Sequence, residues 1–235
     1  MDVLLFDGTH QTNRFDLKVV PVTAVGSNVL FSARNRAPRN LHLALFAMTS
    51  ESVEAYSWCC QQLEDMVGVG PNVRAVFTDG LREYDEVVRV NFPEANHFRC
   101  LWHIEKQVHR AFARPLGAAF GKMWDIFKTV VFARTRSDYD TKKAELESFL
   151  MAEIRHARAE KKTALIAWMK SLFADHEKKF VFAFMKEEFT LGIVSTQRSE
   201  ATNSSIKSRV SSRAYLGMFM NAVGTFQRRD KHKPT

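Results

Sequence analysis

This 235-residue chain has few cysteines, and it shows neither a secretory signal nor a long apolar run. It has three cysteines, two of them the adjacent pair Cys59 and Cys60, so it cannot build a disulfide framework, and we expect a reducing compartment. No run reaches the roughly 18 apolar residues of a membrane span, so we expect no membrane partner. A secretory signal consists of a basic region ahead of a long apolar stretch, and the N-terminus does not show this pattern.

Apolar residues are plentiful: they make up 46% of the chain and include 19 Phe and 4 Trp. This composition is enough to bury a sizeable core and argues against disorder. The length fits one large domain, or a core that carries an insertion.

Positive charge is concentrated near the C-terminus. The net charge is +8, and residues 198–235 hold eight Lys or Arg against two acids, which leaves +6 there and +2 elsewhere. A smaller basic group, Arg34, Arg36 and Arg39, lies in a loop-like stretch. Such local charge suits a polyanion whose phosphates it can contact, although a solvated tail and loop would have the same composition.

The first hundred residues predict a mixed α/β sheet. Val3–Phe6, Leu17–Val25 and Leu41–Met48 are apolar runs typical of a three-strand meander, and Pro21 indicates an edge position or a bulge in the second. A helix beginning near Thr49 follows, then a fourth apolar strand, Val73–Phe77. After another helix, a short stretch leads into a third one.

Two of these strands end on an aspartate followed by a glycine: Asp7 ends the first and Asp79 the fourth. A crossover through a helix joins parallel strands, so pairing of these two would bring both carboxylates to the same edge of the sheet. Carboxylates that close repel each other, which raises a pKa unless a cation lies between them.

From Pro115 to about Glu188 the apolar residues repeat at helical spacing and strand signals are nearly absent. We therefore expect residues 1–113 to be the first part of a sheet-containing core. Residues 114–190 would be a helical insertion, and 191–235 a return to the core with a basic tail.

A third acid, Glu200, falls in the first turn of a helix predicted from the hydroxyl-rich segment STQRSEATNSSIKSR. Asn203 and Lys207 follow it on the same helix face. A first-turn glutamate alone usually only complements the helix dipole, so its meaning depends on its neighbours.

Four motifs in order resemble those of Mutator-like (MULE) transposases and the FAR1/FHY3-type plant proteins derived from them. They are DGTHQTN, TDG, FPEANHFRCLWH and TQRSEATN, and an ART…Y pattern begins at Ala133. The resemblance runs from about Asp2 to Arg213, nearly the whole chain.

The resemblance implies an RNase H-like fold interrupted by a helical insertion, with a DDE triad of Asp7, Asp79 and Glu200. Carboxylate oxygens suit hard cations, so two Mg²⁺ or Mn²⁺ ions are the implied cofactors. The implied reaction is DNA transposition, in which water attacks a DNA phosphodiester and the freed 3′-hydroxyl then attacks target DNA. The family also implies action in the nucleus and a homo-oligomer that pairs two DNA ends.

Other residues receive roles around the triad. Cys100 and His103 would adjoin the active site or face DNA, with zinc binding and plain packing as alternatives; we do not expect zinc, since a structural site needs four ligands. His10 and Asn203 would line the same site or face DNA, although a role in the turn after Asp7 is equally open for His10. The residues expected to contact DNA phosphates are Lys207, Arg209, Arg213, Arg34, Arg36 and Arg39.

Two other functions remain open. One is a domesticated DNA-binding or regulatory protein that keeps the fold without the chemistry, and the other is a different RNase H-like nuclease. Related transposases also carry zinc-binding recognition modules, for which three cysteines are too few, so we expect sequence-specific recognition of DNA ends to lie outside these residues.

Overall fold

The computed structural model describes residues 2–8, 15–25, 41–70, 72–154, 159–185, 188, 190 and 193. The chain forms two compact units. One consists of Met1–His97 with Thr190–Thr235, and the other of Phe98–Phe189. Within the described ranges, no helix combines the length and apolar character needed to cross a bilayer.

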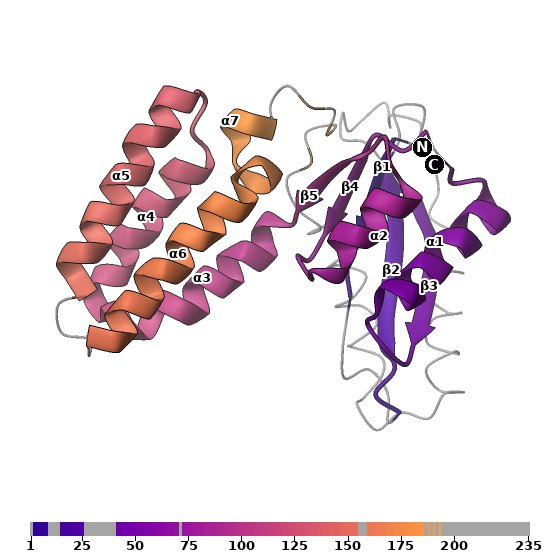
Figure 1. Ribbon diagram of the computed structural model, residues 1–235, viewed down its shortest axis with the longest axis horizontal. Coiled ribbons are helices and arrows are strands. Elements are labelled where there is room, and N and C mark those ends of the chain that lie inside the picture. Colours follow the sequence, from indigo (N-terminus) through magenta and orange to yellow (C-terminus); the bar gives the residue numbers. More distant parts are fainter. Residues whose placement is uncertain are drawn as a thin grey trace, which may run out of the picture. The chain divides into compact units, whose positions relative to one another are not determined.

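A mixed five-stranded sheet forms the first unit, and its order is β3-β2-β1-β4-β5 (Figure 1). The strands are β1 (Val3–Phe6), β2 (Lys18–Val25), β3 (Leu41–Met48), β4 (Ala75–Thr78) and β5 (Asn96–Arg99). The first three pair antiparallel as a meander, whereas β4 lies parallel to β1 on its other side. The predicted α/β class is confirmed, and the first and fourth strands pair, which was the condition for Asp7 and Asp79 to meet.

Pro21 lies inside the sheet, because β2 is flanked by β3 and β1. Of the two predicted placements, the edge position is therefore wrong, whereas a bulge or similar irregularity is present. The pairing of β2 with β3 instead changes register between Val22 and Thr23, directly after the proline. A local irregularity of this kind lets an interior strand accommodate a residue that cannot donate to the ladder.

The strand β5 was not foreseen from the sequence, which indicated only a lead into the next helix. Its residues, Asn-His-Phe-Arg, lack an apolar run, and only its N-terminal residue is exposed. The backbone N–H of Asn96 donates to the carbonyl of Arg74 at 2.9 Å. Pairing with the neighbouring segment of the sheet, rather than local propensity, thus makes these residues a strand.

Two helices, α1 (Val53–Val67) and α2 (Glu83–Asn91), cover one face of the sheet (Figure 1). Ser52 begins α1 by accepting the N–H of Ala55 at 3.3 Å, and Gly68, at φ 63°, ends it in the left-handed conformation. Their apolar stripes bury Tyr56, Leu63, Tyr84 and Val88 against alternate residues of the strands, such as Leu4 and Phe6.

The other unit is helical. It contains α3 (Leu101–Leu116), α4 (Phe120–Val131), α5 (Arg136–Glu153), α6 (Ala159–Phe180) and α7 (Phe182–Met185). One cluster of buried side chains from these helices forms its core, with ring contacts that link Trp124 to Phe127 and Phe127 to Phe173. The expected helical periodicity is confirmed here, and α3 contributes Ile104, Val108 and Phe112 to the same core.

The ART…Y pattern has a structural role in this unit. Thr135 begins α5 by accepting the N–H of Asp138 at 3.1 Å. Tyr139, fully buried on α5, donates its hydroxyl to Glu177 of α6. Burial of the Tyr139 ring, followed by the Glu177 carboxylate, raises the pKa of this phenol well above its usual value. The pattern therefore starts one helix and ties it to another.

Candidate active site

Parallel pairing of β1 and β4 brings two carboxylates to one edge of the sheet. Val3 pairs with Ala75 and Leu5 with Phe77, and extension of this register by two residues places Asp7 opposite Asp79. Both strands are fully buried, and so is the Asp7 side chain. An acid with no exposed surface at a strand end needs a compensating group, since an isolated buried charge is strongly unfavourable.

Asp79 is oriented by the turn that follows it. Its Oδ1 accepts the backbone N–H of Leu81 at 3.1 Å. Gly80 adopts φ 96°, a conformation that residues with a side chain rarely adopt, so the TDG motif requires its glycine. The turn thereby fixes one carboxylate oxygen of Asp79 and leaves Oδ2 directed toward the neighbouring strand end.

Gly8 lies between two acidic side chains. A Cβ atom placed on Gly8 would lie 3.6 Å from Oδ2 of Asp79 and 3.6 Å from Oε1 of Glu51. A methyl group would therefore fill the space that these two carboxylates border. The glycine of the DGT motif keeps this space open.

Glu51 is a residue of this site that sequence reasoning missed. It directly precedes Ser52, the cap of α1, so its position predicted only an acid near a helix N-terminus. Its closeness to Gly8 appears only once the sheet and α1 are assembled. The one sequence signal was an acid just after a strand, the same signal that marked Asp7 and Asp79.

Two buried tyrosines lie next to the acids. The hydroxyl of Tyr56 donates to Oε1 of Glu51 at 3.3 Å, and the rings of Tyr56 and Tyr84 are 4.3 Å apart. Burial raises the pKa of Tyr56 above its usual range, and so, to a lesser extent, does the charge of Glu51 and Asp79. Burial likewise raises the pKa of Tyr84, with smaller contributions from Tyr56, Asp79 and Asp7. Both phenols therefore stay protonated and can act as donors.

A second polar chain supports the end of β4. Oγ1 of Thr78 lies 2.9 Å from Nε2 of His97, and Nδ1 of His97 lies 3.1 Å from a carboxylate oxygen of Asp85. Since the carboxylate accepts a proton from Nδ1, Nε2 is left to accept the hydroxyl proton of Thr78. The threonine of the TDG motif is fully buried, so this chain satisfies its hydroxyl and links β4 to β5 and α2.

These donors fit a hard cation in chemical type. The oxygens of Asp7, Asp79 and Glu51 are carboxylate ligands of the kind that Mg²⁺ and Mn²⁺ prefer, and the space beside Gly8 borders two of them. Within the described part of the chain, no three His, Cys, Asp or Glu side chains converge as a metal-binding group. Glu200 lies outside the described residues.

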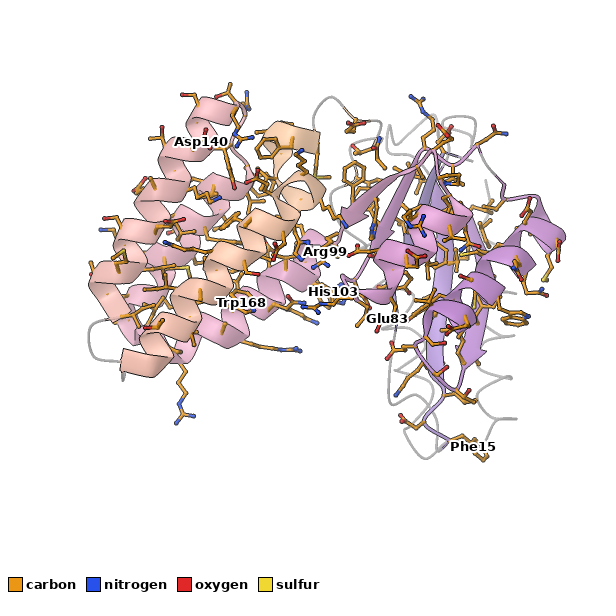
Figure 2. The ribbon with its side chains drawn as sticks, in the orientation of Figure 1. Phe15, Glu83, Arg99, His103, Asp140 and Trp168 are labelled. Atoms are coloured by element: carbon orange, nitrogen blue, oxygen red, sulfur yellow. The ribbon has the colours of Figure 1, made fainter. Side chains whose placement is uncertain are left out.

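Cys100 and His103 belong to the helical unit. Cys100 is fully buried at the start of α3, and His103 follows in its first turn (Figure 2). Burial, followed by the charges of Lys106 and Arg110, lowers the pKa of His103 to about 4. The imidazole is thus neutral near pH 7, and the place of this pair beside the carboxylates stays a prediction.

Several predicted residues lie outside the described part of the chain, so their roles also stay predictions. They are His10, Arg34, Arg36, Arg39, Glu200, Asn203, Lys207, Arg209 and Arg213.

The fold and the site together define a class of protein: a mixed α/β domain that has carboxylates at adjacent strand ends and is joined to a helical unit. Residues 3–107 match the MULE transposase domain. The matched segment contains Asp7, Asp79, Cys100 and His103, whereas Glu200 lies beyond it. The resemblance inferred from the motifs is therefore confirmed.

Two curated relatives from Arabidopsis thaliana align with nearly all of the chain. Protein FAR-RED IMPAIRED RESPONSE 1 is 24% identical over 95% of this chain, and Protein FAR1-RELATED SEQUENCE 4 is 23% identical over 95%. The chain spans only 24% and 28% of the length of these two proteins.

Proposed function

We propose that this chain carries the catalytic domain of a DDE-type transposase, which hydrolyses DNA phosphodiesters and transfers DNA strands in a metal-dependent reaction. Asp7, Asp79 and Glu200 are the proposed catalytic residues. The observation that carries the proposal is the parallel, in-register pairing of β1 and β4, which brings two aspartates to adjacent strand ends within the segment that matches the MULE transposase domain.

The proposed triad would hold two Mg²⁺ or Mn²⁺ ions, which would stabilise charge on the attacking and leaving oxygens of the phosphodiester. The remaining residues of the site position these acids. The N–H of Leu81 holds one oxygen of Asp79, and the hydroxyl of Tyr56 holds Glu51 beside Gly8. We assign Glu51 to this site as an additional acid that orients or assists the triad.

The strand order supports an RNase H-like fold as the framework of this site. An antiparallel meander is followed by a parallel strand that adds beside β1, and the helix α1 lies in the crossover. The proposed partners are transposon ends and target DNA, bound by a homo-oligomer in the nucleus.

The second candidate is a DNA-binding protein without catalysis. One observation suggests it: the name of one relative, Protein FAR-RED IMPAIRED RESPONSE 1, refers to a far-red response rather than to transposition. Under this proposal the acids of the site would be retained for the fold, and DNA would be bound but not cut.

Metal binding and DNA nicking together separate the two candidates. Calorimetry with Mg²⁺ or Mn²⁺ and nicking of a supercoiled plasmid should be compared for the wild type, Asp79→Asn and Asp65→Asn. Asp65 is an exposed aspartate of α1, so its variant removes the same charge from the same unit. The transposase proposal predicts that both metal binding and nicking fall in Asp79→Asn and persist in Asp65→Asn.

Equal metal binding by all three proteins, with no nicking in either metal, would reject the transposase proposal in favour of the second candidate. Nicking that survives in Asp79→Asn would reject the assignment of the triad.

A further inference from the structure

The exposed side of α3 carries three cations in a row. Lys106, Arg110 and Arg114 follow one another at four-residue intervals, and all three are exposed. At 1.5 Å per residue this cationic ridge extends over about 12 Å. The opposite side of the helix carries the apolar residues Ile104 and Val108, which are buried in the helical core. The ridge therefore lies on a surface of the helical unit that its own core does not use.

The ridge contains no compensating acid of its own. The one acidic residue of α3 is Glu105, and burial raises the pKa of its carboxyl while the charge of Lys128 on α4 acts in the opposite direction. Glu105 is thus partly buried on the side of Lys128. Lys106 and Arg110, and likewise Arg110 and Arg114, are like charges at i and i+4, a spacing that destabilises a helix slightly.

Several other cations of the helical unit have acidic partners. Lys142 lies 3.0 Å from Asp138, Lys128 lies 3.2 Å from Asp125, and Lys170 lies 3.6 Å from Glu147. The described residues provide no ion pair to any member of the ridge. A solvated helix face normally mixes both signs, as α5 does, so the ridge differs from the surface around it.

Two contacts shape the N-terminal end of the ridge. The ammonium of Lys106 lies 3.2 Å from the centre of the Trp102 ring, which packs edge-on to His103 at 4.7 Å. A cation held over an aromatic face has less freedom to lose when it binds an anion. His103 is neutral near pH 7 because its pKa is lowered to about 4, so it adds no positive charge to the ridge.

We propose that the cationic ridge of Lys106, Arg110 and Arg114 binds the sugar–phosphate backbone of double-stranded DNA. Three cations along about 12 Å match roughly three to four phosphates of one strand, which rise 3.4 Å each. The partner is identified as DNA because the proposed function makes DNA the substrate, and the inference rests on that proposal. Contacts of this kind position the duplex and are independent of its sequence.

The test compares two triple variants of the full chain that lose the same charge. One replaces Lys106, Arg110 and Arg114 by Gln, and the other replaces Lys128, Lys142 and Lys170 by Gln. Binding of a labelled random-sequence duplex is measured by fluorescence anisotropy at several salt concentrations. Circular dichroism of both variants checks that the helices are retained.

The ridge variant is expected to bind more than tenfold more weakly at low salt. The plot of log K against log salt should become less steep by about 2.7. This value corresponds to roughly 0.9 for each of the three phosphates that the ridge no longer neutralises. The control variant should bind less than about threefold more weakly than the wild type, because its three cations are already paired with acids.

If both triple variants lose the same DNA affinity, the proposed role of the ridge is wrong, since net charge alone would then explain the loss. If the ridge variant binds DNA as tightly as the wild type, the proposed role of the ridge is wrong. The proposed function would not be affected by that result, because the wild type still binds DNA. Ridge-dependent binding of RNA in preference to DNA would overturn the choice of partner. A wild type that binds no DNA at any salt would reject both the ridge and the proposed function.

Discussion

The two units of this chain place their polar groups in opposite ways. In the sheet unit, polar side chains are buried at the strand ends, where Asp7 and Thr78 have no exposed surface. In the helical unit most charges lie on the surface, several of them in pairs, whereas the largely buried Glu177 accepts the hydroxyl of Tyr139 from another helix. Buried polar groups that converge on one point favour a reactive site, whereas dispersed pairs favour a scaffold or a binding surface.

The difference has a physical cause. Parallel strands end at the same edge of a sheet, so side chains far apart in sequence meet there. Packed helices bring apolar stripes together instead, and their polar residues point outward. The first prediction tests whether the helical unit is the scaffold that this comparison implies.

Phe127→Ala should have the largest effect on stability. The Phe127 ring is fully buried and contacts the rings of Trp124 and Phe173. Its removal leaves a cavity, so the free energy of unfolding should fall by about 3–5 kcal/mol. Denaturant unfolding and hydrogen exchange should show the destabilisation in the helical unit. Phe132→Ala is the control, because Phe132 is 48% exposed. Equal destabilisation by both variants would contradict a core centred on Phe127.

Acid should destabilise the helical unit through His103. Its pKa is lowered from 6.5 to about 4 in the folded state, so between these pH values the unfolded chain binds the proton and the folded chain does not. Stability therefore decreases as pH falls through this range, by at most about 3 kcal/mol. His103→Gln should flatten this part of a plot of unfolding free energy against pH.

His109→Gln, on an exposed position of the same helix, is the control for that experiment and should retain the slope of the wild type. An unaltered slope in His103→Gln would show that another group binds the proton.

Two tyrosines, one in each unit, test the comparison directly. Tyr139→Phe removes a hydrogen bond to the carboxylate of Glu177, so unfolding should become easier by about 1–3 kcal/mol, with DNA nicking unchanged. Tyr56→Phe removes the longer 3.3 Å bond to Glu51 and should cost about 1 kcal/mol, yet it should slow nicking because Glu51 loses its anchor. Each variant controls for the other. If Tyr139→Phe slowed nicking and Tyr56→Phe did not, the assignment of the sheet unit as the site and the helical unit as the scaffold would be wrong.

The smallest expected effects come from surface charge. Arg110→Gln should stabilise the protein by a few tenths of a kcal/mol, because Arg110 has a like charge one turn away on each side. Lys170→Gln should destabilise it by a similar amount, because Lys170 lies 3.6 Å from Glu147. Thermal unfolding of the two variants gives the signs. Two shifts of the same sign would contradict the view that ridge charges are unbalanced and other charges are paired.

Much of the fold could be predicted because its signals are local. β1 and β4 are short apolar runs bounded by polar residues, and the helices after Pro115 repeat their apolar residues at helical spacing. The strand β5 could not be predicted, since its Asn, His and Arg residues carry no such pattern. Pro21 predicted an edge position or a bulge, and only the pairing of β2 on both sides decided for an irregularity in the interior of the sheet.

The candidate site divides in the same way. Asp7 and Asp79 were predictable because each directly follows a strand, and the parallel pairing inferred from the crossover is present. Glu51 was missed, since the acid that follows β3 also directly precedes the cap of α1 and so resembles an acid that complements a helix dipole. The partners of Thr78 were hidden as well, because His97 and Asp85 come from a different strand and a helix.

The sequence by itself therefore determined the strands, the helices and the acids at two strand ends, because side-chain periodicity and turn residues act over a few neighbouring positions. Only the tertiary structure decided which groups meet: Glu51 with Asp79 beside Gly8, and Thr78 with His97. Among the described residues, it also decided which cations of the helical unit find acids and which, on α3, do not. Distances across a sheet or between helices depend on how whole elements pack, and no single segment encodes them.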